Sequence, residues 1–156
     1  MRYLSRISVL ASVTVMVLAS AAGASEGYVT NYEEIVKAAD WSNMKTVVVE
    51  LDEHSYSHDG LHFKVGQSYR LRLRNVGEQK HYFTAPEFFR SIATRKVQSD
   101  KDGEIKAPYF TALEMMANGG TLDLYFVPVR TGRYPVRCTI DDHERQGMHD
   151  TITIAD

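Results

Sequence analysis

A cysteine, a histidine and a methionine follow one another at regular spacing near the C-terminal end of the sequence. They are Cys138, His143 and Met148, in the order Cys-x4-His-x4-Met, and Cys138 is the only cysteine of the 156 residues. A second imidazole stands upstream at His81, where an apolar segment begins. One thiolate, two imidazoles and a weak axial thioether form the ligand set of a type 1 copper centre. The sequence therefore predicts one copper ion bound by His81, Cys138, His143 and Met148.

The first histidine of this set has competitors in the sequence. We favour His81 because it opens a strand-like segment after the Asn-x-Gly turn signal at Asn75. The other candidates are His54, His58, His62 and His149.

Three of these histidines form a series of their own, because His54, His58 and His62 are each four residues apart. On a helix they would share one face, but serine, aspartate and glycine between them favour a polar loop. Two interpretations stay open: a solvated loop without function, or a second, weaker copper site.

Other chemistry fits the motif less well. Zinc also binds cysteine and histidine, but the residues do not pair at zinc-site spacing and methionine is a poor zinc ligand. A Cys–His nucleophilic pair would need an oxyanion-stabilising loop, and it leaves Met148 unexplained. We therefore expect no catalytic residues and no enzyme activity.

Residues 1–24 are typical of a secretory signal. Arg2 and Arg6 precede an apolar stretch over 7–19, and small residues follow. About 20 apolar residues are needed to span a bilayer, and this stretch is shorter. It therefore predicts a cleaved signal, and an uncleaved membrane anchor is the alternative. An exported protein with one unpaired cysteine needs an explanation, and metal ligation supplies it. We expect a periplasmic protein with an extension over 25–44 and one domain over 45–156.

Composition sets limits on the partners. The sequence is 44% hydrophobic and 24% charged, as in ordinary globular proteins. Removal of residues 1–24 takes away two arginines and changes the formal net charge from −2 to −4. A mildly acidic domain argues against a nucleic-acid partner, because phosphate binding requires clustered lysine and arginine. The expected partners are redox proteins and a copper ion, and we expect a monomer that does not insert stably into a membrane once the signal is cleaved.

Hydrophobic alternation predicts an all-β Greek-key β-sandwich. Expected strands cover 45–51, 61–65, 69–74, 81–84, 121–127, 132–138 and 151–154. Expected helices cover 32–43 at the N-terminus and, within an insertion over 86–118, residues 86–93 and one turn between 109 and 117. Since the loops of a sandwich gather at its two ends, the Cys138–Met148 loop and the start of the His81 strand should meet at one pole.

This constellation resembles the cupredoxin family, which includes plastocyanin, azurin and rusticyanin. The resemblance runs through 61–81, 120–127 and 132–154, and it implies a copper β-sandwich in which the four residues above are ligands. It also implies that His143 lies nearest the surface and passes the electron. The chain departs from the pattern at Tyr82, where many cupredoxins carry asparagine, and in its longer 86–118 insertion.

The segment over 81–89 and the upstream histidines also resemble the CopI-like periplasmic proteins of copper tolerance. Two functions follow as hypotheses. The first is an exported type 1 copper protein that carries one electron between periplasmic redox partners. The alternative is a periplasmic copper-tolerance protein that sequesters or oxidises Cu(I). In either case an apolar shell should raise the reduction potential, and its candidates are Phe83, Pro135, Val136 and Ile140.

Overall fold

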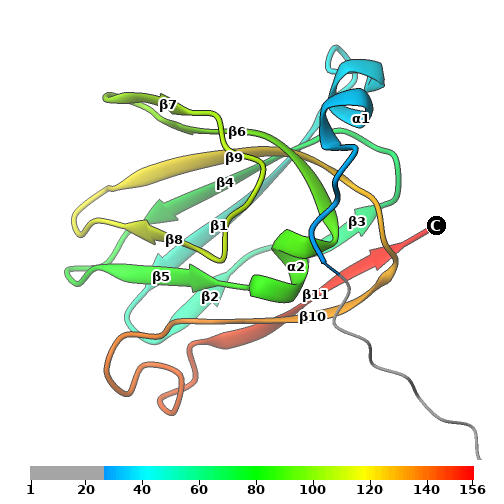
Figure 1. Cartoon of the computed structure of the whole chain (residues 1–156). Coiled ribbons are helices and arrows are strands. Elements are labelled where there is room, and N and C mark those ends of the chain that lie inside the picture. The colour runs from blue at the N-terminus through cyan, green and yellow to red at the C-terminus, as the bar shows by residue number, and fades with distance from the viewer. Residues whose placement is uncertain (1–26) are drawn as a thin grey trace, which may run out of the picture.

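The computed structural model describes residues 27–156, so the predicted signal over 1–24 lies outside the described residues. The described chain folds into two facing β-sheets (Figure 1). One has six strands in the order β2-β1-β4-β9-β6-β7, which are β2 (Ser55–Ser57), β1 (Lys45–Asp52), β4 (Tyr69–Asn75), β9 (Thr121–Pro128), β6 (Ile92–Ser99) and β7 (Gly103–Ile105). The other has five in the order β3-β11-β10-β5-β8, which are β3 (His62–Lys64), β11 (His149–Ala155), β10 (Gly132–Arg137), β5 (His81–Thr84) and β8 (Ala112–Met115). The predicted all-β sandwich is confirmed.

Strand β4 shows how alternation builds the sandwich. Its even-numbered arginines face outward, and its leucines, Leu71 and Leu73, are fully buried between the sheets. The chain crosses between the sheets several times: it passes from β4 to β5, back to β6, and later from β8 to β9 and on to β10. Such crossings bring the ends of β5 and β10 to the same pole of the sandwich.

Aromatic side chains fill the centre of the core. The ring of Phe63 lies 4.9 Å from that of Tyr69 and 5.2 Å from that of Phe126, both nearly edge-to-face. Phe88, from helix α2 (Pro86–Arg90), packs against Phe126 at 5.4 Å. Large buried rings contribute strongly to the hydrophobic stabilisation of a small domain.

The predicted N-terminal helix is present as α1 (Tyr32–Ala38), shorter than expected. It contacts β6 and β9 through a separate small cluster, in which Ile35 and Val36 pack against buried Val29, Ala93 and Val127. Helix α2 confirms the short helix predicted after Thr84, with Pro86 in its first turn.

The rest of the 86–118 insertion corrects the prediction, because most of it is strand. The expected helical turn within 109–117 is wrong: β8 occupies this segment and pairs antiparallel with β5. Its alternation covers only four residues, with Leu113 and Met115 buried, which is too short to stand out in the sequence. Strand β6 was hidden by a β-bulge at Arg95, which interrupts the pairing with β9 and breaks the two-residue period.

Within residues 27–156, no helix is long and apolar enough to cross a membrane.

Candidate metal centre

Cys138 and Met148 face each other at the end of one strand pair. Cys138 follows β10 directly, Met148 directly precedes β11, and the two strands are paired up to Arg137 and His149. The ladder continues by one bond, because the Cys138 backbone N–H donates to the Met148 carbonyl at 3.0 Å. The sheet therefore fixes where both sulfur-bearing residues stand.

The intervening loop folds His143 back onto Cys138. The His143 N–H donates to the Ile140 carbonyl, and the Met148 N–H donates to the His143 carbonyl, each at 3.0 Å. Gly147 turns the chain at φ +115°, a conformation that other residues rarely adopt. As a result His143 Nδ1 lies 3.5 Å from Cys138 Sγ.

His81 reaches the same point from β5. Its Nδ1 lies 4.0 Å from Cys138 Sγ, and its position is set by pairing with Met115 of β8. The ligand atoms of His81, Cys138 and His143 all lie within 4.8 Å of one another, and all three residues are buried. No other group of three or more such side chains with this spacing occurs among residues 27–156. The cluster can hold a metal ion.

The donors fit a soft metal. Burial lowers the pKa of His81, and neighbouring His143 lowers it further, so His81 stays neutral and keeps a lone pair for coordination. Its Nε2 is buried and has no hydrogen-bond partner. The side chain of Met148 is fully buried, and its carbonyl accepts the Cys138 N–H, while its role as axial ligand stays a prediction. A cysteine sulfur and two imidazoles, with Met148 as the predicted fourth ligand, are the donor set for which copper is suited.

Asn75 orders the loop that leads to His81. Its buried amide donates to the carbonyls of Gln79 and Met115, at 2.7 Å and 3.1 Å, and accepts from the Gly77 N–H at 3.0 Å. The sequence marked Asn75 only as a turn signal. The structure shows that it ties the β4–β5 loop to β8, directly before the first predicted ligand.

Two tyrosines lie beside the Cys138 sulfur or support its neighbour. The Tyr82 N–H points at Cys138 Sγ at 3.4 Å, and the Tyr82 carbonyl accepts a 2.6 Å hydrogen bond from the Tyr56 hydroxyl. Burial raises the pKa of Tyr56, so the hydroxyl stays protonated and remains a donor. Tyr56 was missed, and its one signal is an aromatic residue in the otherwise polar stretch over 54–60.

Three of the four residues expected to form an apolar shell lie in or against the hydrophobic core. Phe83 and Val136 are fully buried, and Ile140 packs against the same core. Pro135 is exposed, because the alternation of β10 turns it to the opposite face from Val136. It is therefore not part of the shell.

The three upstream histidines do not come together as a second metal group. His58 is engaged at both ring nitrogens, with Asp150 Oδ2 at 2.8 Å and the Gly60 N–H at 2.9 Å. His62 lies exposed on β3. His54 stands in the β1–β2 turn, where its ring centroid is 5.0 Å from that of His143. Strand β2 occupies the stretch between His54 and His58, where the sequence favoured a polar loop.

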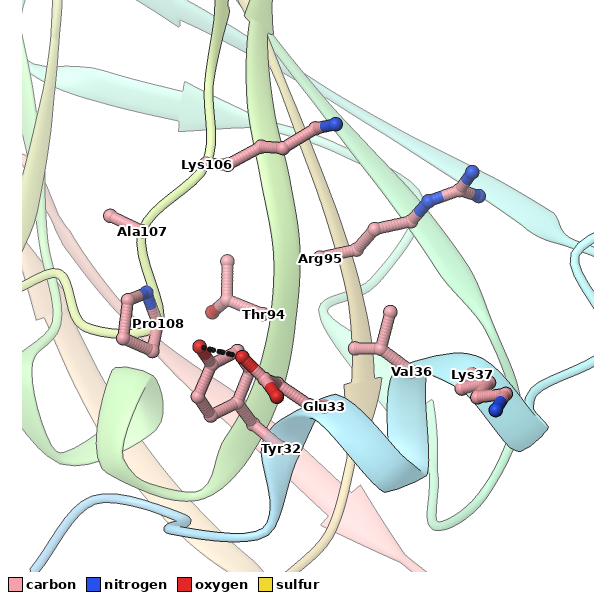
Figure 2. Close-up of a pocket in the computed structure, with 9 residues that line it drawn as sticks. All are labelled: Tyr32, Glu33, Val36, Lys37, Thr94, Arg95, Lys106, Ala107 and Pro108. Atoms are coloured by element: carbon pink, nitrogen blue, oxygen red, sulfur yellow. Dashed lines mark hydrogen bonds between the residues drawn. The ribbon is translucent and has the colours of Figure 1, made fainter.

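A hollow of about 350 Å³ lies elsewhere, between α1 and β6 (Figure 2). Tyr32, Glu33, Val36, Thr94 and Pro108 are among the residues that line it, and Figure 2 shows the hydrogen bond that the Tyr32 hydroxyl donates to Glu33. None of the four predicted ligands lines it, so this hollow is separate from the metal cluster.

The fold has clear structural relatives. A multicopper oxidase from Pseudomonas thermotolerans aligns with a TM-score of 0.57 and 21% identity, over 75% of this chain and 31% of that one. A blue copper oxidase from Nitrosomonas europaea aligns with a TM-score of 0.52 and 15% identity, over 77% of this chain and 45% of that one. Auracyanin B aligns with a TM-score of 0.48 and 18% identity, over 72% of this chain and 89% of that one.

The likeness to the two oxidases shows a shared fold, the cupredoxin-type sandwich that the sequence predicted. The chain spans less than half the length of either oxidase. No protein-family model matches the sequence, and neither does any curated protein.

Proposed function

We propose that this protein is an exported cupredoxin that binds one copper ion through His81, Cys138, His143 and Met148, and carries one electron between periplasmic redox partners. The observation that carries the proposal is the convergence of one thiol sulfur and two imidazoles within 4.8 Å at a buried pole. The structural relatives named for copper oxidases support the choice of metal, since they share the fold that holds this cluster.

The chemistry follows from the softness of the donors. A thiolate and a thioether favour Cu(I), while imidazole suits both oxidation states. The β10–β11 ladder and the Asn75 hydrogen bonds hold the donors in place, which favours rapid electron exchange because little has to move between oxidation states. A set of four protein donors offers no free position for a substrate, so the proposal is a carrier and not an enzyme.

The alternative is a copper-tolerance protein of the CopI-like group, which would sequester or oxidise periplasmic Cu(I). One observation favours it. Met116 exposes 62% of its surface and directly follows Met115, the residue that pairs with His81. A thioether that is open to solvent, one residue along the chain from the partner of His81, is suited to capture Cu(I).

The remaining parts of the proposal concern the protein as a whole. We propose cleavage of a signal over 1–24, an extension over 25–44, one domain over 45–156, and a monomer that does not insert stably into a membrane after cleavage. Redox proteins are the proposed partners, and nucleic acid is not, because the formal net charge is −2.

The test uses purified, copper-loaded protein. Copper stoichiometry and a redox titration should give one copper per chain and a reversible one-electron wave, without oxygen consumption in the presence of Cu(I). Oxygen consumption coupled to Cu(I) oxidation would contradict the carrier. In the source organism, a respiratory defect of the deletion strain supports the carrier, while sensitivity to copper with more than one tightly bound copper supports tolerance.

A further inference from the structure

The metal cluster is buried, and a residue that is not among its predicted ligands packs against it. Only 3% of His143 is exposed, and His81, Cys138 and Met148 are fully buried. His143 is the most exposed of the four, in line with the resemblance to cupredoxins, and the His54 ring packs against it, with centroids 5.0 Å apart and planes at 78°. Figure 1 shows the β1–β2 turn at the same end of the sandwich as the β10–β11 loop.

This turn is anchored beside the cluster by Glu53. Its Oε1 accepts the N–H groups of Glu78 and Gln79, at 2.7 Å and 3.1 Å, both on the loop that leads into His81. Asp52 Oδ1 accepts the Glu53 N–H at 2.8 Å. Glu53 thus bonds the β1–β2 turn to the loop that precedes His81. The next residue, His54, covers His143.

His54 also holds an unusual backbone conformation, at φ +63°. This left-handed region is unfavourable for residues other than glycine and asparagine, and such conformations persist where the surroundings impose them, often at functional sites. The His54 carbonyl also lies close to Gly147, 3.6 Å from the place that a Cβ on this glycine would take. The turn therefore sits directly on the loop that supplies His143.

We propose that His54 is a positioning residue that shields His143 and closes the cluster, so that a reagent or a metal ion reaches Cys138 only when the β1–β2 turn moves aside. The role of the turn in copper exchange rests on the proposed function, but the shielding of Cys138 does not.

The shielding is tested on the metal-free full chain. Cys138 is the single thiol, so the rate of its alkylation by iodoacetamide under native conditions reports how often the cluster opens. His54→Asn tolerates the left-handed backbone and removes the ring, and we expect alkylation to become faster by roughly tenfold or more. His54→Ala should behave in the same way. His54→Phe restores a ring without a donor nitrogen, and alkylation should return to within about twofold of the wild-type rate.

The matched control is His62→Ala, which removes an exposed imidazole from β3 and should leave the rate unchanged. Thermal unfolding followed by Trp41 fluorescence confirms that each variant is folded. An unchanged rate in folded His54→Asn would overturn the inference, as would a His54→Phe variant as reactive as His54→Asn.

A second measurement separates this inference from the proposed function. Release of copper from the loaded protein to a strong chelator should be faster in His54→Asn than in the wild type and His62→Ala. If the wild type binds copper and neither rate responds to His54, the shielding fails and the copper proposal stands. If the wild type binds no copper but alkylation still responds to His54, the shielding stands and the copper proposal fails.

Discussion

The Tyr82 backbone N–H lies 3.4 Å from Cys138 Sγ, which joins the strand that bears His81 to the residue that bears the thiol. Tyr82 is held in turn by the Tyr56 hydroxyl, at 2.6 Å from its carbonyl. An N–H donor stabilises a thiolate, and such bonds to the sulfur of a copper centre tune its reduction potential. The β1–β2 hairpin therefore influences the metal cluster without providing a ligand.

Replacing Tyr56 with phenylalanine tests this influence. The change leaves the partly buried Tyr82 carbonyl without its donor. We therefore expect the free energy of unfolding, measured in urea, to fall by about 1 kcal/mol. Copper should still bind, and the thiolate absorption band should shift because the Tyr82 N–H moves relative to Cys138. Tyr134→Phe, which removes a hydroxyl bonded to the Arg130 carbonyl outside the cluster, is the control and should leave the band in place. If the band does not move in Tyr56→Phe, the hairpin does not influence the thiolate.

Met148→Leu tests the axial ligand. Leucine fills a similar volume in this fully buried position, so we expect a stability loss below about 1.5 kcal/mol and copper that remains bound. The reduction potential, measured by protein-film voltammetry, should rise because a sulfur donor is replaced by an apolar group. If the potential stays at the wild-type value, Met148 is core packing and not a ligand.

The ion pair between Arg72 and Asp123 should stabilise the six-stranded sheet. Arg72 donates to both carboxylate oxygens at 2.8 Å, and only 5% of the Asp123 side chain is exposed. We expect Asp123→Asn to lower the free energy of unfolding by about 1–3 kcal/mol, since one partner is partly solvated. Glu50→Gln, in the exposed pair with Arg74, should cost no more than about 1 kcal/mol. If Asp123→Asn and Glu50→Gln lose the same free energy of unfolding in urea, the stabilising role of the Arg72–Asp123 pair is contradicted.

Acid should loosen the β1–β2 turn. A hydrogen bond with Asp52 and the two backbone donors hold the pKa of Glu53 at about 2, below its ordinary value of 4.5. Because the folded pKa is the lower one, the ionised carboxylate stabilises the fold fully above pH 4.5, and this contribution is lost as pH falls towards 2. The stability difference between wild type and Glu53→Gln should be constant from pH 7 to 5 and then shrink. A difference that is independent of pH down to 2 would refute this role.

The sequence predicted the fold where the alternation of side chains is long and unbroken. Strand β4 was visible because its arginines and leucines alternate over the whole strand. Strand β6 was not, because the bulge at Arg95 shifts the period, and β8 was too short to separate from a helical turn. The topology that places β8 beside β5 comes from pairing between distant segments, which local pattern does not encode.

The cluster was predictable for a related reason. Cys138, His143 and Met148 are close in sequence and rare in type, so their spacing alone indicated shared chemistry, and the structure brings His81 to Cys138 and His143 as expected. The supporting residues were not predictable in the same way. Asn75 and Tyr56 act through hydrogen bonds to backbone groups far away in sequence, and His54 acts by covering His143.

The central claim is a copper–thiolate bond at Cys138, and the visible absorption spectrum of the copper-loaded protein tests it most directly. We predict an intense visible band in the wild type with one copper per chain, and its loss in Cys138→Ser, because the band arises from charge transfer from the thiolate to Cu(II). A wild type that binds one copper without such a band, or a Cys138→Ser variant that keeps it, would contradict the account.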